Sequence, residues 1–345
     1  MIQTGLWGTK KIKKGDFTFI DLFGGIGGTR LGFESAGGEC VFTSEWDKYA
    51  QKTYQANFGE IPYGDITKIS TDDIPKFDVL LAGFPCQPFS SIGKRQGFMH
   101  ATQGTLFYDV ARIIKDKRPS TFMLENVQGL ITHDKGNTLK VILKTLDELN
   151  YDVQYKLINA ADFGVPQMRK RVYIVGFDRD ATKDYKNFTF PLGSPEQHSD
   201  IGKIVEKNAD AKYSISKHLQ KSYLFKLDDG RPRLIDHDTK GPGKTLVASY
   251  HKIQRLTGTF VKDGPTDLRL FTENECKALM GFPRNFNVPV SRTQMYRQFG
   301  NSVVVPVVSA IAKSVKPVLM TAKEEEKIPN EQRNTITTNH AQAYS

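Results

Sequence analysis

The chain is poor in cysteine and has no long apolar run, and both absences narrow the class of protein it can be. Its three cysteines, at positions 40, 86 and 276, are far apart and form no CxxC pair. This pattern indicates neither a disulfide framework nor a zinc cluster. We therefore expect a reducing cytoplasm and no bound metal. No segment resembles a signal peptide, and we expect no membrane span.

Acidic residues are outnumbered by basic ones, which favours a polyanionic partner. The chain has 48 Lys and Arg against 38 Asp and Glu, a formal net charge of +10, and a pI near 9.3. Such a balance is common in proteins that bind nucleic acid, although many basic proteins bind none. Residues 1–16 carry four closely spaced lysines, and we expect them to form a basic mobile arm.

Short apolar runs alternate with helical patterns over residues 17–177, which predicts an α/β domain. The predicted strands cover residues 17–23, 40–44, 77–82, 120–124, 153–158 and 172–177, with a further short strand ending at residues 64–66. The alternation then stops. The length suits one large domain with a smaller companion. We assign residues 178–289 to the smaller, irregular domain with a return segment, 290–320 to the large domain again, and 321–345 to a disordered tail.

A glycine-rich turn, residues 24–28, follows the first strand and would let a ligand approach the backbone closely. Arg30 breaks the G-x-G-x-x-G spacing, so a dinucleotide is disfavoured. Glu45 and Trp46 end the second strand, where a carboxylate beside a flat ring suits a nucleoside. Asp65 could accept from an exocyclic amine, or could simply be a turn residue.

Cys86 lies on a turn that follows a buried strand and is bracketed by Pro85 and Pro88. The prolines restrict the backbone, and open α/β sheets place their chemistry at such strand ends. A small buried hydrophobe is the alternative role for this cysteine. The glycine-containing stretch 91–105 predicts a long loop beside it, and we interpret this loop as a lid.

Three charged residues complete the pattern of strand-end motifs. Glu125 ends the strand predicted over residues 120–124. Arg169 and Arg171 enter the strand predicted over residues 172–177 at alternating positions, so we expect them to point the same way. A carboxylate or phosphate would suit this arginine pair.

Together these motifs resemble those of the cytosine-C5 DNA methyltransferases, in the order that the family has them. The matching segments are DLFGGIGG (21–28), EW (45–46), GDI (64–66), GFPCQPFS (83–90), ENV (125–127), QMRKR (167–171), LMGFP (279–283) and QFGNSV (298–303). The resemblance implies a Rossmann-like mixed sheet, S-adenosylmethionine as methyl donor, and a smaller target-recognition domain. It also implies double-stranded DNA as substrate, a monomer acting in the cytoplasm at the nucleoid, and a cognate restriction endonuclease.

The resemblance also assigns roles to residues. Cys86 would add to C6 of a flipped-out cytosine, Glu125 would serve N3, Arg171 would orient Glu125, and Arg169 would contact the base. The implied cofactor-binding residues are Phe23, Gly24, Gly25, Ile26, Gly27, Gly28, Glu45, Trp46, Asp65, Ile66, Pro85, Leu106, Asn301 and Ser302. The implied DNA-binding residues are Gln87, Ser90, Lys94, Arg95, Thr245 and Tyr250. Gln103 stands where the family usually has an arginine.

Two alternatives share part of this pattern. A tRNA cytosine-C5 methyltransferase would carry the same motifs, but residues 88–91 and the long middle domain favour a DNA enzyme. A non-catalytic DNA-binding protein could use the same fold, but Cys86, Glu125 and Arg169 would then have no reason to occur together.

We predict that Cys86→Ser abolishes methyl transfer and leaves cofactor binding largely intact, because a serine alkoxide is much harder to form than a thiolate. Transfer is measured with labelled methyl donor and binding by calorimetry. Near-normal turnover in the variant would contradict the role given to Cys86.

Overall fold

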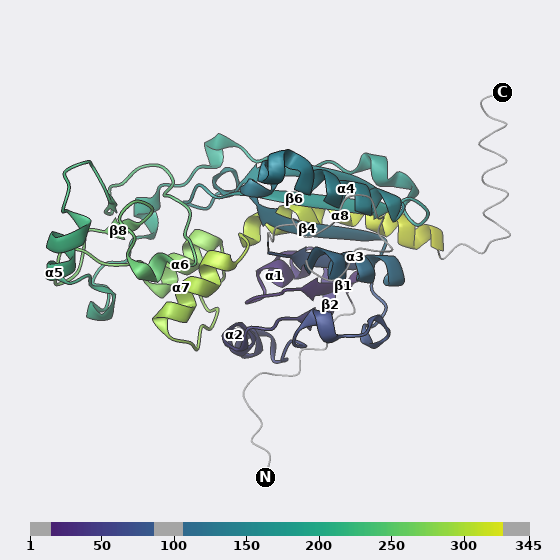
Figure 1. The fold of residues 1–345 in the computed structure, drawn as a ribbon, viewed down its shortest axis with the longest axis horizontal. Helices are drawn as coiled ribbons and strands as arrows, with labels where there is room; N and C mark the ends of the chain where they lie inside the picture. The colour runs from purple at the N-terminus through teal and green to yellow at the C-terminus, as the bar shows by residue number, and fades with distance from the viewer. Residues whose placement is uncertain (1–14, 86–105, 327–345) are drawn as a thin grey trace, which may run out of the picture.

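The computed structural model describes residues 15–85 and 106–326, which form a layered α/β domain and a smaller irregular domain at one end of it (Figure 1). The large domain contains a six-stranded sheet with strand order β2-β1-β3-β4-β6-β5. The strands are β1 Phe17–Leu22, β2 Gly38–Ser44, β3 Val79–Gly83, β4 Thr121–Val127, β5 Tyr151–Asn159 and β6 Lys170–Asp178. Strands β2, β1, β3 and β4 are parallel, whereas β6 is antiparallel to both β4 and β5. The predicted mixed sheet is confirmed.

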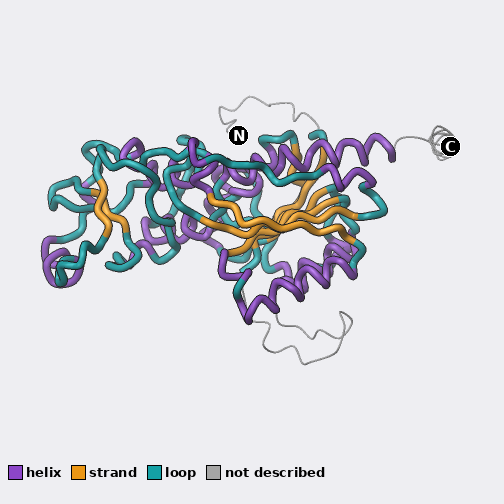
Figure 2. Tube along the Cα trace, turned by 90° about the horizontal axis from the view of Figure 1, so that it is seen from above, coloured by secondary structure: helices purple, strands orange, loops and turns teal. Residues whose placement is uncertain are grey.

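Helices cover both faces of the sheet, as Figure 2 shows from above. They are α1 Gly28–Glu34, α2 Lys48–Phe58, α3 Leu106–Lys117, α4 Asn137–Glu148 and α8 Val305–Glu326. The alternation of β1 shows why two layers form. Phe17 and Phe19 belong to the apolar cluster that contains residues of α1 and α8, whereas Ile20 and Leu22 belong to the cluster of α3 and α4. Successive strand side chains point to opposite faces, so one apolar strand serves both layers.

The prediction of a strand that ends at residues 64–66 is wrong. Tyr63 forms only an isolated bridge with Ser44. Asp65 instead caps a short 3₁₀ helix, Ile66–Lys68, by accepting a hydrogen bond from the Thr67 amide. Pro62 supplies no amide donor to a ladder, and the Asp65 side chain favours the turn.

Helix α8 continues to Glu326, so the disordered tail was predicted to begin too early, at residue 321; residues 327–345 lie outside the described ones. Its buried residues include Val308, Ile311 and Leu319. The stretch Arg292–Glu324 is long and apolar enough to cross a membrane, contrary to our reading of the sequence, but half of its most apolar part is buried inside the molecule. Packing against α1 and the sheet accounts for this apolar character.

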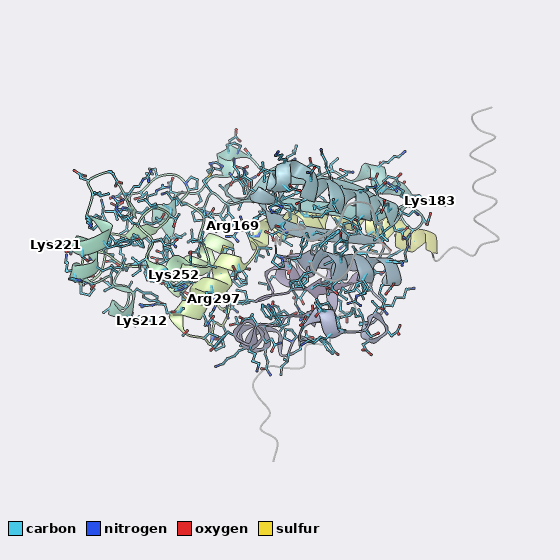
Figure 3. All side chains as sticks on the ribbon, viewed as in Figure 1. Arg169, Lys183, Lys212, Lys221, Lys252 and Arg297 are labelled. Carbon is cyan, nitrogen blue, oxygen red and sulfur yellow. The ribbon has the colours of Figure 1, made fainter. Side chains whose placement is uncertain are left out.

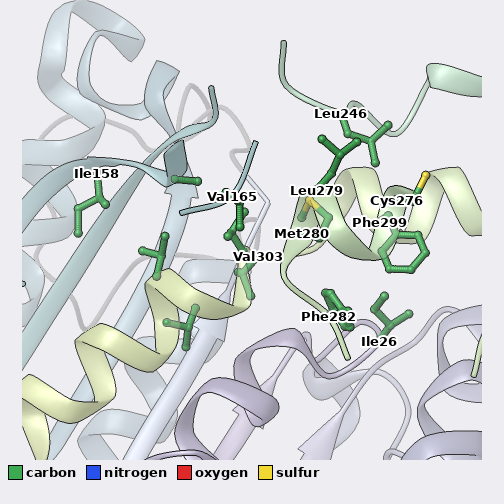
Figure 4. Close-up of a cluster of buried hydrophobic side chains, with 14 of the residues drawn as sticks. Ile26, Ile158, Val165, Leu246, Cys276, Leu279, Met280, Phe282, Phe299 and Val303 are labelled. Carbon is green, nitrogen blue, oxygen red and sulfur yellow. The ribbon is translucent and has the colours of Figure 1, made fainter. Parts of the chain in front are cut away.

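The smaller domain has little regular structure. It contains the two-stranded sheet β7 Arg233–Ile235 and β8 Thr259–Val261, and the helices α5 Lys217–Leu219 and α6 Glu273–Met280. Helix α7, Arg292–Asn301, packs against α6 and against residues 250–252. Leu279, Phe282 and Phe299 continue into an apolar cluster with Ile26 and Val303 of the large domain (Figure 4). The two domains therefore share one continuous core.

Candidate active site at the carboxyl edge of the sheet

A cavity of about 1430 Å³ lies where the four parallel strands end. Residues that follow or end β1, β2, β3 and β4 line one wall, and residues 294–303 line another. Because parallel strands bring their carboxyl ends to one edge, the motifs that are far apart in sequence meet here. Four predicted features, the glycine turn, Glu45, Gly83–Pro85 and Glu125, share this one cavity.

The glycine turn passes close to the end of α7. Phe23 and Gly25 both have positive φ, 57° and 55°, so the backbone turns sharply after β1. A Cβ on Gly28 would lie 2.8 Å from the Ser302 hydroxyl oxygen, so a side chain there would clash with the opposite wall. Gly27 does not line the cavity: its φ is 86°, and a Cβ would meet the Phe58 ring at 2.3 Å. Gly27 therefore packs against the Phe58 ring, and the structure does not give it the predicted contact with the cofactor.

Glu45 is held by two backbone amides. Its Oε2 accepts from Gly25 N at 2.8 Å and its Oε1 from Asp47 N at 2.7 Å. Burial raises the pKa of this carboxyl, and the two amide hydrogen bonds oppose that effect. The Trp46 side chain beside it is 77% exposed. Asp47 caps α2 by accepting from the Tyr49 and Ala50 amides, which is the ordinary role that its position suggests.

The cavity gathers most of the other predicted cofactor residues and several that the sequence did not indicate. The remaining predicted ones on its wall are Phe23, Gly24, Ile26, Asp65, Ile66, Pro85, Leu106, Asn301 and Ser302. The unpredicted ones include Thr29, Ser44, Tyr108, Asp109, Arg112, Gln294, Arg297 and Gln298. The hydroxyl of Ser44 and the amide nitrogen of Gln298 are buried and have no hydrogen-bond partner among the described residues. Unpaired buried polar groups are costly, so the cavity, with one such group on each of its two walls, fits a polar ligand.

Glu125 and Arg171 form an ion pair on adjacent strands. Arg171 Nε lies 3.1 Å from Glu125 Oε1, and both side chains are largely buried. Strands β4 and β6 place them there, because Glu125 is paired with Tyr173 and Val127 with Arg171 in the antiparallel register. Burial raises the pKa of Glu125, whereas the charges of Arg171 and Arg169 oppose the shift. Burial thus favours the neutral, proton-donating form of this carboxyl.

Arg169 is only 2% exposed and does not line the cavity. Its Nη1 donates to the Leu246 carbonyl at 2.9 Å, and its Nη2 donates to those of Gly300 at 2.9 Å and Ser302 at 2.7 Å. Burial also lowers the pKa of the Arg169 guanidinium to about 10. The geometry therefore does not give Arg169 the predicted contact with the base. Arg169 immediately precedes strand β6, which begins at Lys170, and its charge still acts on Glu125.

The predicted DNA-reading residues are placed differently from one another. Tyr250 is 5% exposed; its hydroxyl donates to the Thr259 carbonyl, and its ring stacks on Phe260 and Phe271. It is a core residue, and its predicted contact with DNA is wrong. Thr245 is partly exposed, donates to the Met168 carbonyl, and stays a prediction.

The catalytic turn and the predicted lid fall outside the described residues. The predicted residues outside the described ones are Cys86, Gln87, Ser90, Lys94, Arg95 and Gln103. Pro85, the last residue described before this segment, lines the cavity. The Asn126 side chain donates to the Phe84 carbonyl at 2.8 Å and so fastens the start of the turn to the end of β4.

Comparison with known proteins gives one consistent result. The family description "C-5 cytosine-specific DNA methylase" matches residues 17–317. The chain is 58% identical over 310 residues to the Type II methyltransferase M.MspI of Moraxella sp., covering 90% of this chain and 73% of that protein. It is 60% identical over 306 residues to M.BsuFI of Bacillus subtilis, with coverages of 89% and 74%.

Solved structures share the fold at low sequence identity. The S. pombe Dnmt2 methyltransferase aligns with a TM-score of 0.69 at 20% identity, over 88% of this chain and 99% of that one. A Spodoptera frugiperda DNMT2 mutant aligns with a TM-score of 0.67 at 23% identity, with the same coverages.

We predict that Arg169→Met lowers the free energy of unfolding more than Arg171→Met. The first change leaves three carbonyl acceptors without their donor, at a cost of about 1–3 kcal/mol for each buried group that stays unpaired. The second leaves Glu125, which can take up a proton. Urea denaturation measures both variants. Wild-type stability in Arg169→Met, or a larger loss in Arg171→Met, would contradict the anchoring role of Arg169.

Proposed function

The chain belongs to the C-5 cytosine-specific DNA methylase family and methylates cytosine C5 at specific sites in DNA, and on this premise we propose how the cavity carries out the reaction. The sequence-based expectation of a DNA enzyme of the restriction-modification type is confirmed by this membership. The observation that carries the proposal is that Glu125 and Arg171 share one cavity with Glu45, Trp46 and the glycine turn. A nucleoside site and an acid–base site thus adjoin each other.

S-adenosylmethionine fits the nucleoside end of the cavity and supplies the methyl group as an electrophile. Glu45 would accept hydrogen bonds from the ribose hydroxyls, since its two amide bonds leave lone pairs free. Trp46 offers an exposed ring for the adenine face, and Asp65 accepts from the exocyclic amine. The turn at residues 23–25, with Asn301 and Ser302 opposite, would hold the amino-acid end.

Cys86 supplies the nucleophile in this proposal. Cytosine C5 is a poor nucleophile, so the ring must first be activated by addition of a thiolate at C6. A free thiol with a pKa of about 8.5 is mostly protonated at neutral pH, so nearby positive charge would assist its ionisation. Because Pro85 is on the cavity wall, the chain enters the cysteine-containing segment at the site of reaction.

Glu125 and Arg171 stabilise the charge that this addition creates. Attack at C6 moves an electron pair toward N3 and O2 of the base. Neutral Glu125 donates its proton to N3, and Arg171, which orients Glu125, lies on the same wall to stabilise the charge on O2. C5 then takes the methyl group, and N3 returns its proton to Glu125. A base removes the C5 proton, and the Cys86 sulfur leaves C6 as a thiolate. The cytosine must leave the duplex stack to reach these groups.

The biological setting is the remaining part of this proposal. We expect a monomer that acts on the bacterial nucleoid in the cytoplasm. We also expect a restriction endonuclease that cuts the same site when it is unmethylated. Type II methyltransferases at 58% and 60% identity support this pairing.

We predict a stable covalent adduct with a duplex whose target cytosine is replaced by 5-fluorocytosine, in the presence of S-adenosylmethionine. Addition at C6 and methyl transfer proceed, but fluorine cannot leave C5 as a cation, so protein and DNA stay joined. A denaturing gel detects the product as a shifted band. The band should require the methyl donor.

Matched substrates and variants separate the alternatives. Cys86→Ser should give no band, and Glu125→Gln should give a strongly reduced one while still binding the duplex. An enzyme acting on RNA would give the band only with fluorinated RNA, and a passive binder would give none. Absence of the adduct on a pool of all short duplex sites would overturn the proposed mechanism.

A further inference from the structure

Helix α7 brings a positive charge to the cavity that the reaction described above does not use. Gln294 and Arg297 both line the cavity, and they lie three residues apart on one helix. Figure 3 labels Arg297 on α7, beside the gap between the smaller domain and the sheet. Side chains three residues apart are neighbours on a helix surface, so the two can act on one ligand.

Arg297 differs from the two other arginines on the cavity wall. Arg112 donates to the Ile66 and Ile69 carbonyls and pairs with Asp109, and Arg171 pairs with Glu125. Arg297 is exposed, and within residues 15–85 and 106–326 it forms no ion pair. Residues 86–105 contain no Asp or Glu that could become its partner. Its charge is therefore available to an anion.

The backbone of α7 holds Arg297 in a fixed place. The Tyr296 hydroxyl donates to the Phe271 carbonyl at 2.5 Å, and Phe299 is fully buried. The Ser291 side chain caps the helix by accepting from the Gln294 amide. The apolar side of α7 is thus fastened to the smaller domain, and Arg297 is presented from a rigid element rather than from a loop.

The volume of the cavity suggests two ligands. Small-molecule sites commonly measure about 300–1,000 Å³, whereas this cavity measures about 1430 Å³. The methyl donor would occupy the end near Glu45, and an extruded cytosine would occupy the end near Glu125 and Arg171. A flipped nucleotide remains attached to its strand, so its flanking phosphates must come to the mouth of the same cavity.

We propose that Arg297, assisted by Gln294, binds a phosphate next to the flipped cytosine. This inference rests on the proposed position of the cytosine between Glu125 and Arg171. A guanidinium binds phosphate and carboxylate alike, so the carboxylate of the methyl donor is the competing ligand. The DNA phosphate is favoured because Arg297 is exposed, whereas Ser302 already provides a polar group beside the glycine turn.

Salt dependence of DNA binding tests the proposal. The probe is a duplex with the recognition site, identified by methylome sequencing of DNA from cells that express the protein, with S-adenosylhomocysteine present. Loss of one phosphate contact should make the plot of log K against log salt shallower by about 0.9 for Arg297→Gln. Arg297→Lys should keep most of the slope. Affinity for S-adenosylhomocysteine, measured by calorimetry without DNA, should not change.

Arg292→Gln is the matched control, because Arg292 is an exposed arginine of the same helix that does not line the cavity. It should leave the salt slope unchanged. The proposal would be overturned if Arg292→Gln made the salt slope as shallow as Arg297→Gln does. It would also be overturned if Arg297→Gln left the slope unchanged, with or without weaker binding of S-adenosylhomocysteine. Arg297→Gln should still form the 5-fluorocytosine adduct at saturating DNA. A failure of the adduct in the wild-type protein would instead count against the proposed mechanism.

Discussion

The ion pair between Glu125 and Arg171 is the interaction on which the account of this active site depends. It exists because β6 runs antiparallel to β4, so residues of the two strands that are 46 positions apart meet at the same edge. The parallel part of the sheet brings the glycine turn and Glu45 to that edge as well. Burial makes the neutral form of Glu125 accessible, and the paired arginine fixes the direction of the carboxyl.

Arg169 connects the smaller domain and the end of α7 to this edge of the sheet. One guanidinium joins a loop of the smaller domain, at Leu246, to the end of α7, at Gly300 and Ser302. The same α7 region contributes Asn301 and Ser302 to the cavity. The return of the chain from the smaller domain is therefore part of the site, and the shared apolar core holds it there. Two neighbouring arginines thus have separate contacts: Arg169 joins parts of the fold, and Arg171 pairs with Glu125 on the cavity wall.

Much of this arrangement could be predicted from sequence because it depends on local patterns. Apolar runs mark β1, β2, β3 and β4, and the carboxyl ends of parallel strands must meet at one edge of the sheet. The positions of the residues that we assigned wrongly or did not predict depend instead on tertiary contacts. Tyr250 is an aromatic residue in a polar stretch, yet it packs among Phe260 and Phe271. Arg297 belongs to none of the quoted motifs, and only the docking of α7 brings it to the cavity.

The most direct test of the central claim is the pKa of Glu125, measured by NMR titration of protein labelled with ¹³C at the glutamate carboxyl. The resonance is assigned by its loss in Glu125→Gln. Burial should hold the pKa above the ordinary value of 4.5, and Arg171→Met should raise it further, because it removes a charge that stabilises the carboxylate. A pKa at or below 4.5, or one that falls in Arg171→Met, would contradict the account.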